Sequence, residues 1–175
     1  MTLTFPARFT LITAMNPCPC GFFGDSRNRC TCTERDIKRY TGKISGPLLD
    51  RIDLHLEVAA LDYKEMSDSA RGESSQKIKE RVDQARAVQG IRFTEESGIY
   101  CNSQMNSKLV EKYCALDQKS SNLLEKSVNR LGLSARAYHR ILKMARTIAD
   151  MAASEAIQQA HVAEAVQFCR TSHQS

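Results

Sequence analysis

Tryptophan is absent from the sequence, and only five tyrosines and six phenylalanines occur among its 175 residues. So few aromatic rings argue against a surface built for stacking on single-stranded bases. No stretch approaches the roughly 20 apolar residues that span a bilayer, so no membrane partner is expected. The short apolar run at 9–15 lacks the charged flank and cleavage site of a signal peptide, which predicts a cytoplasmic protein.

A phosphate-binding loop of the pattern G-x-x-x-x-G-K-[ST] is also absent. The sequence also lacks a large excess of charge of either sign, because 25 basic and 20 acidic residues leave a net charge of only +5. This mild excess permits a polyanionic partner without demanding one, and it is far from the composition of a tail that coats nucleic acid.

Residues 1–60 are patterned like two β-strands separated by a loop. The apolar, β-branched run at 9–15 predicts a short buried strand, which Asn16 and Pro17 end because proline cannot continue a central ladder. Residues 52–58 alternate strictly between apolar and polar side chains, which predicts an edge strand with one solvated face.

The remainder of the chain is patterned as helices. Apolar residues recur at helical spacing over 78–88, and Gly90 is expected to end that helix, while 91–105 looks irregular. Helix N-caps are predicted at Thr33, Asn106, Asp117 and Ser134. A last helix is expected over 160–170. The predicted fold class is an α/β fragment plus an all-α part, with domains 1–60, 61–105 (a linker and a connecting helix) and 106–175.

Two single residues stand where α/β proteins place ligand-binding groups. Asn16 follows the first predicted strand, where its amide can orient a water or a phosphate, and a turn asparagine is the alternative interpretation. Arg51 follows a short helix built around two leucines, from where a guanidinium can stabilise a transferring phosphoryl group in a neighbouring subunit. The alternative is a local salt bridge of Arg51 with Asp50 or Asp53.

A basic stripe follows the cap at Ser134. Arg136, Arg140 and Lys143 lie at i, i+4 and i+7, and therefore on one helix face. Arg136 falls in the first helical turn, where the helix dipole disfavours a cation, so its position suggests a nearby anion. The alternative is an ordinary solvated helix face.

Two Cys-x-Cys pairs are separated by nine residues, and their members are Cys18, Cys20, Cys30 and Cys32. Four thiolates are the complement of a structural zinc site, and a solvent-facing cysteine-rich loop is the alternative. Arg27 and Arg29, between the pairs, are alternative contacts for DNA phosphates or for a neighbouring subunit. The scattered cysteines are expected to be small buried hydrophobes: Cys101, Cys114 and Cys169.

Five runs of sequence are specific enough to compare with known families. They are Phe5-Pro6-Ala7-Arg8-Phe9, Met15-Asn16-Pro17-Cys18-Pro19-Cys20-Gly21, Ser45-Gly46-Pro47-Leu48-Leu49-Asp50-Arg51-Ile52-Asp53-Leu54, Leu133-Ser134-Ala135-Arg136-Ala137 and Arg140 through Asp150. Over roughly residues 4–170 they resemble the C-terminal part of magnesium-chelatase-like AAA+ ATPases of the ComM/YifB competence group. Full members carry a P-loop and an acidic Walker B strand upstream of this region. We therefore expect either part of a longer protein or a truncated reading frame.

The resemblance implies the C-terminal portion of an AAA+ P-loop ATPase core, with sensor 1 and arginine-finger strands, followed by a helical lid. It implies that Asn16 is sensor 1, that Arg51 is the arginine finger and that Arg136 is sensor 2, acting in cis or in trans, with Arg140 beside the nucleotide. It further implies ATP and Mg²⁺ at the interfaces of a ring, usually a hexamer, and ATP-driven branch migration of DNA. Without Walker motifs, the chain alone is expected to be inactive.

Two other functions are compatible with the same residues. One is a metal-chelatase motor that acts on a porphyrin partner. The other is a zinc-bearing helical module that binds nucleic acid or protein and has no ATPase activity. A P-loop encoded in frame upstream of Met1 would favour a motor, and a clean start site would favour the module.

Overall fold

The computed structural model describes residue 3, residues 9–59 and residues 72–169. The chain divides into two compact units, Met1–Gly46 and Pro47–Ser175. None of the described helices combines the length and the apolar character needed to cross a membrane.

Three sequence predictions fall wholly or partly outside the described residues. These are the matching run at 5–9, the first part of the predicted linker and connecting helix at 61–105, and the end of the last predicted helix at 170.

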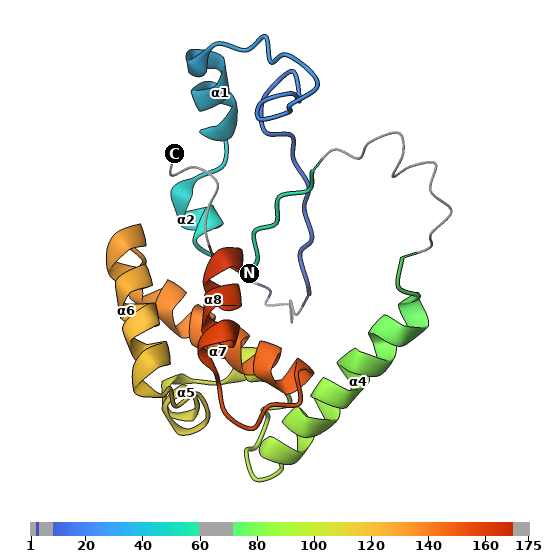
Figure 1. Ribbon diagram of the computed structural model, residues 1–175, viewed down its shortest axis with the longest axis vertical. Helices are drawn as coiled ribbons and strands as arrows, with labels where there is room; N and C mark the ends of the chain where they lie inside the picture. Colours follow the sequence, from blue (N-terminus) through green and yellow to red (C-terminus); the bar gives the residue numbers. More distant parts are fainter. Residues whose placement is uncertain (1–2, 4–8, 60–71, 170–175) are drawn as a thin grey trace. The chain divides into compact units, whose positions relative to one another are not determined.

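The first unit is built from turns and one helix, α1 (Glu34–Thr41; Figure 1). The side chain of Thr33 accepts a hydrogen bond from the backbone N–H of Asp36, and the Asp36 carboxylate accepts one from the backbone N–H of Thr33. This capping box satisfies two amides at the start of α1, so the predicted cap at Thr33 is confirmed. The short helix α2 (Gly46–Leu49) follows, as the two leucines predicted.

The two predicted strands are not formed in the structure, so the α/β class is not confirmed. Over 9–15 the side chains are exposed, 77% for Phe9 and 90% for Ile12, and 52–58 is not a strand either. A strand needs a neighbour that takes up its backbone hydrogen bonds, and the described residues offer neither segment such a neighbour. Within those residues the β interactions are limited to one isolated parallel bridge, between Leu116 and Ile157.

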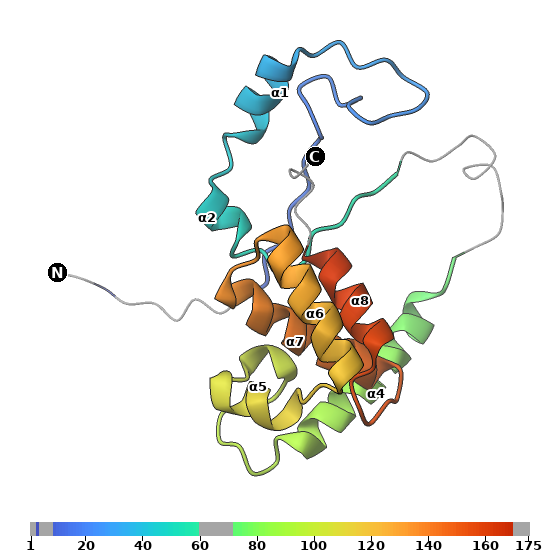
Figure 2. The same cartoon turned by 60° about the vertical axis from the view of Figure 1, so that its left-hand side comes forward.

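The second unit is helical, as the periodicity predicted. Its elements are α4 (Ser75–Arg92), the 3₁₀ turn η1 (Asn102–Gln104), α5 (Ser107–Tyr113), α6 (Gln118–Leu131), α7 (Ala135–Met151) and α8 (Gln159–Phe168). Helix α7 packs against α8, α4, α5 and η1, and α6 packs against α8 (Figures 1 and 2). The predicted caps are confirmed, because the side chains of Asn106, Asp117 and Ser134 each accept a backbone N–H three residues ahead.

The core of this unit gathers around α7. Ile141, Ala145 and Ala149 are fully buried on one face of α7, and Val162 and Ala165 of α8 are buried with them. An apolar stripe at this spacing is what drives an amphipathic helix onto its neighbours.

Gly90 does not end α4, contrary to the prediction. The helix continues to Arg92, and the N–H of Phe93 closes it onto the carbonyl of Gln89. Gly90 adopts no positive φ, so nothing in its conformation breaks the helix. The buried ring of Phe93 and the tertiary contacts of Arg92 outweigh the roughly 1 kcal/mol propensity deficit of one glycine.

Candidate functional site

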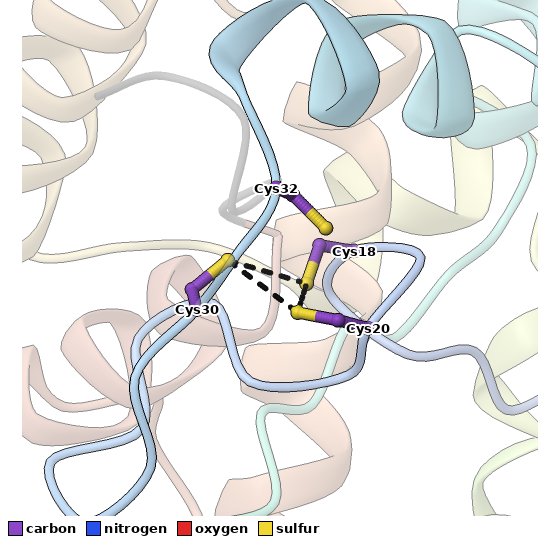
Figure 3. Close-up of side chains that lie close together, drawn as sticks. All are labelled: Cys18, Cys20, Cys30 and Cys32. Carbon is purple, nitrogen blue, oxygen red and sulfur yellow. Dashed lines mark hydrogen bonds between the residues drawn. The ribbon is translucent and has the colours of Figure 1, made fainter.

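The structure brings the four loop cysteines together (Figure 3). The sulfur of Cys18 lies 3.3 Å from that of Cys20 and 3.7 Å from that of Cys30, and the Cys20 and Cys30 sulfurs are 3.6 Å apart. With Cys32 included, all four sulfurs lie within 4.8 Å of one another. Cys18 is completely buried although the loop around it is exposed.

These spacings suit one tetrahedral metal ion. With zinc–sulfur bonds of about 2.3 Å, the sulfur–sulfur edges of a tetrahedron measure roughly 3.8 Å, close to the three shortest distances observed. Soft thiolate ligands in a closed set of four favour zinc over hard cations such as magnesium or calcium. The donor set therefore fits a structural metal site, and these four residues are the ones that would hold the ion.

The thiols of the cluster differ in acidity. Hydrogen bonds from the backbone N–H groups of Phe22 and Thr31 lower the pKa of Cys20 to about 5. The backbone N–H of Cys20 lowers the pKa of Cys32, but burial and the neighbouring thiols outweigh it and raise that pKa to about 12. The pKa values of Cys20 and Cys32 are thus shifted in opposite directions, and a bound cation would favour the thiolate form of both.

A second site is assembled around Arg51 in the helical unit. Arg140 of α7 donates from Nη1 to the carbonyl oxygens of Asp50 (2.9 Å) and Ile52 (2.7 Å), the residues on either side of Arg51. The Ser134 hydroxyl, which caps α7, donates to the Asp50 carboxylate (3.3 Å). These bonds hold the Arg51 segment at the N-terminal end of α7, the end that carries Arg136.

Arg51 and Arg136 both leave their charge at the surface. Arg51 donates from Nη1 to the carbonyl of Pro47 (2.8 Å) and forms no ion pair with any described residue, so the local salt bridge with Asp50 or Asp53 is not formed. Arg136 is exposed in the first turn of α7 and has no polar partner within the described part of the chain. An anion placed at this end of α7 would meet the exposed guanidinium groups of Arg51 and Arg136, and it would lie near the Asp50 carboxylate that accepts a hydrogen bond from Ser134.

The three residues of the predicted basic stripe on α7 have different surroundings. Arg140 is engaged as above, and its buried Nε has no partner among the described residues. Lys143 donates to the carbonyl of Ser103 (3.0 Å). The alternative of a fully solvated face therefore applies to Arg136 alone, and a direct contact of Arg140 with nucleotide stays a prediction.

Asn16 belongs to the other unit. It is exposed directly before the cysteine cluster, and its side-chain amide lies beside Gly21, whose φ is +85°. Arg51 and Arg136 belong to the helical unit, so the role of Asn16 as sensor 1 stays a prediction.

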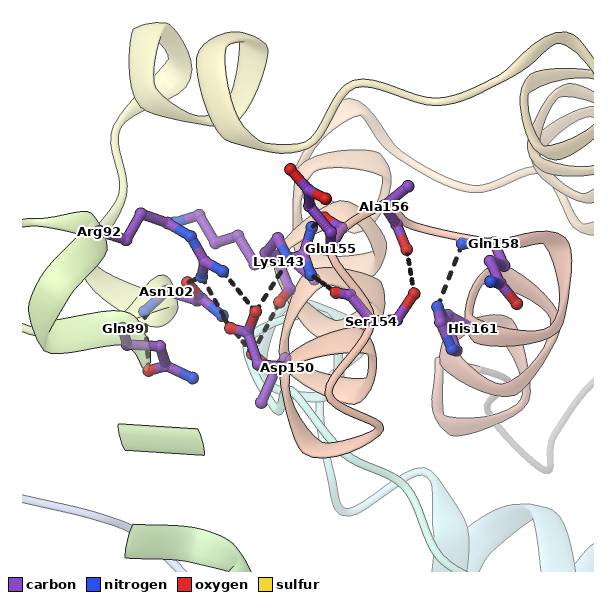
Figure 4. A network of polar contacts seen from close by, with 12 residues as sticks. Gln89, Arg92, Asn102, Lys143, Asp150, Ser154, Glu155, Ala156, Gln158 and His161 are labelled. Carbon is purple, nitrogen blue, oxygen red and sulfur yellow. Dashed lines mark hydrogen bonds and ion pairs between the residues drawn. The ribbon is translucent and has the colours of Figure 1, made fainter. Parts of the chain in front are cut away.

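The sequence analysis missed a buried polar network that ties α4 and η1 to α7 (Figure 4). Arg92 binds both carboxylate oxygens of Asp150, and Arg146 donates from Nε to the same carboxylate (3.0 Å). Asn102 donates to Asp150 (2.7 Å) and to Thr147 (3.0 Å). Burial raises the pKa of Asp150, but the hydrogen bonds from Arg92 and Asn102 and the two guanidinium charges outweigh it and lower the pKa overall.

A signal for this network was present in the sequence. Arg146 and Asp150 lie at i, i+4 on the apolar face of α7, where unpaired charges would be costly, so a paired arrangement was implied. Of the scattered cysteines, Cys114 and Cys169 are buried as predicted, whereas Cys101 is half-exposed and its thiol lies 3.1 Å from the Ser103 hydroxyl.

Two family models match successive parts of the chain. The model of magnesium chelatase subunit ChlI matches residues 1–66, and the model of the C-terminal part of that subunit matches residues 72–169. The chain belongs to the magnesium chelatase ChlI family. The second match covers the helical unit, which is therefore the ChlI C-terminal domain.

Relatives within the ChlI family are close. Competence protein ComM of Haemophilus influenzae is 44% identical over 167 residues, which cover 95% of this chain and 31% of ComM. The uncharacterised proteins YifB of Salmonella typhimurium and Escherichia coli are 41% and 40% identical over the same length, which covers 32% of each. The chain thus spans about a third of the length of the curated relatives it matches.

Proposed function

We propose that this protein supplies the nucleotide-sensing part of a cytoplasmic, ring-forming ATPase that remodels DNA. The observation that carries the proposal is that Arg140 donates hydrogen bonds to the carbonyls of the residues on both sides of Arg51. These bonds hold the exposed Arg51 at the same helix end as Arg136. In a ring, usually a hexamer, this end of the helical unit faces ATP and Mg²⁺ at a subunit interface. Arg51 is then the arginine finger, Arg136 sensor 2 and Asn16 sensor 1.

The chemistry of the site supports a phosphate ligand. Phosphoryl transfer is accelerated by cations that meet charge on the transferring group, and an arginine held by backbone contacts loses little freedom when it does so. Arg140 acts here as a positioning residue, because its Nη1 donates to the carbonyls of Asp50 and Ile52. The name of the Haemophilus influenzae relative, a competence protein, supports DNA rather than a porphyrin as the substrate.

The test places Arg51→Ala in a protein of the relatives' full length. ATP binding is expected to remain close to wild type, whereas turnover falls on the order of 10³-fold, the effect of removing a trans arginine finger. Lys119→Ala is the matched control, because Lys119 is exposed in the first turn of α6, whereas the site lies at the start of α7, which follows the other end of α6. Mixing Arg51→Ala subunits with Walker-defective subunits should restore part of the activity. Wild-type turnover in Arg51→Ala would contradict the assignment.

We also propose that the cysteine cluster holds one structural zinc ion. Its support is the set of sulfur–sulfur distances, which approach the edge of a zinc–thiolate tetrahedron. Elemental analysis should find about one zinc per chain, and Cys30→Ser should remove it. A wild-type chain purified without zinc, with unchanged stability after zinc is added, would refute this assignment.

A further inference from the structure

Two neighbouring phenylalanine rings project from the cysteine loop. Phe22 is 42% exposed and Phe23 is 54% exposed, although both are large apolar side chains. The whole sequence has too few aromatic rings for an extended stacking surface, and single exposed apolar residues are common on proteins. An adjacent pair of exposed rings is nevertheless a candidate for a local contact surface.

Tight turns fix the backbone that carries these rings. The N–H of Asp25 donates to the carbonyl of Phe22 (3.1 Å), and Gly24 takes the positive φ of +83° that such a turn requires. One turn earlier, the N–H of Gly21 donates to the carbonyl of Cys18 (3.0 Å). The Asp25 carboxylate then accepts the backbone N–H of Arg27 (2.8 Å) and closes the loop. The rings therefore project from an ordered turn beside the sulfur cluster.

Basic side chains outnumber acidic side chains in this unit. Over 9–46 there are six basic residues and three acidic residues, which gives this stretch a net charge of +3. Two of the three carboxylates already have partners within the unit: Asp25 accepts a hydrogen bond inside the loop, and Asp36 belongs to the capping box and pairs with Arg39. Arg29 and Arg35 are exposed, one in the cysteine loop and one in the first turn of α1.

We propose that Phe22 and Phe23 stack on bases of single-stranded nucleic acid while Arg29 and Arg35 neutralise its phosphates. This inference rests on the proposed role in DNA remodelling and adds the contact surface and the strand state. Aromatic faces reach bases only where the duplex is open, and stacking is tolerant of sequence because every base has a π-face. The excess of positive charge complements a phosphate backbone, whereas it gives an apolar protein partner no advantage.

The rings and the arginines make different, separable predictions. We expect F22L/F23L, which keeps apolar bulk but removes the ring faces, to weaken binding of a fluorescent oligo(dT) by roughly tenfold or more at fixed salt. R29Q/R35Q should instead flatten the plot of log affinity against log salt concentration, by about 0.7 for each phosphate contact removed. Fluorescence anisotropy of the whole chain measures both.

Matched controls lie in the helical unit. Tyr100→Leu removes a ring that is also exposed, and Lys126→Gln removes an exposed charge, so neither should change affinity or salt slope appreciably. Zinc content and circular dichroism of each variant show whether the fold is kept. A duplex of the same length should bind more weakly than the single strand, and its affinity should not depend on the rings.

The outcomes are distinct. If the wild-type chain binds oligo(dT) and F22L/F23L binds equally well, the stacking inference is overturned while DNA remains the partner. If F22L/F23L instead reduces self-association in analytical ultracentrifugation with no change in oligo(dT) affinity, the rings form a subunit interface and the inference is again wrong. If the wild-type chain binds no oligo(dT), the inference fails, whereas the turnover of Arg51→Ala still tests the ATPase proposal independently.

Discussion

In residues 72–169 seventeen apolar side chains are buried, whereas in residues 9–59 the structure buries only that of Cys18. The helical unit therefore has a conventional core, in which burial of apolar surface offsets the entropy lost on folding. The cysteine unit has none, and its one buried apolar side chain is itself a member of the sulfur cluster.

This contrast shows that one chain can be ordered by two kinds of interaction. Segments too small to bury a core need a metal or disulfides to hold them, and four cysteines within 4.8 Å provide the metal option. The helical unit instead relies on its core and on the Asp150 network. Each perturbation below should affect one unit and spare the other.

The largest effect is expected from removing the metal site. Cys30→Ser, or treatment with a strong chelator, should abolish amide protection over 18–44, because zinc binding contributes about 10–16 kcal/mol to the folding of small zinc modules. Hydrogen exchange followed by mass spectrometry measures this, and protection over 107–168 should not change.

Cys101→Ser is the control for this experiment, since Cys101 is a free thiol outside the cluster. Protection over 18–44 that survives chelation would mean that the turns and the α1 capping box suffice, and the comparison between the units would fail.

A smaller loss of stability, this time confined to the helical unit, is expected from Asp150→Asn. This change leaves the buried guanidinium of Arg146 and that of Arg92 without their counter-charge, which should destabilise the helical unit by about 3–5 kcal/mol. Urea unfolding measures it, with zinc content unchanged. The control is Asp83→Asn, because the exposed pair of Asp83 with Lys79 should contribute no more than about 1 kcal/mol.

The same variant predicts a change in pH dependence. The folded pKa of Asp150 is lowered, so its contribution to stability is present above the unfolded value of about 3.9 and is lost as pH falls through the folded value. Wild-type stability should therefore decline below about pH 5 more steeply than that of Asp150→Asn. Asp117, whose pKa is lowered by its hydrogen bonds with Ser120, leaves a residual slope in both proteins. Parallel curves would show that Asp150 does not carry the effect.

The smallest effect separates two caps within the helical unit. Ser134→Ala and Asn106→Ala should each lower stability by about 1 kcal/mol, because each removes a helix N-cap. Only Ser134→Ala also removes a contact to Asp50, so only this variant should increase hydrogen exchange at the amide of His55 and its neighbours. Equal exchange in both variants would mean that Arg140 alone holds the Arg51 segment.

The sequence alone determined the features that depend on near neighbours. A capping side chain reaches an amide three residues ahead, so Thr33, Asn106, Asp117 and Ser134 identified their helix starts from local spacing. Apolar periodicity over 78–88 identified α4 as a helix for the same reason. The grouping of the four cysteine thiols could also be predicted, because only nine residues separate the two Cys-x-Cys pairs.

Tertiary structure decided whatever required a distant partner. The runs at 9–15 and 52–58 have the pattern of strands, yet a strand exists only when another segment supplies its hydrogen bonds. Gly90 stays helical because residues after it are anchored in the core. Arg140 binds the carbonyls of residues 50 and 52, about 90 positions away, so no local pattern could show that it holds the segment around Arg51. Spacing in the sequence therefore specified the helices and the cysteine pairs, and contacts between distant segments specified which charges meet.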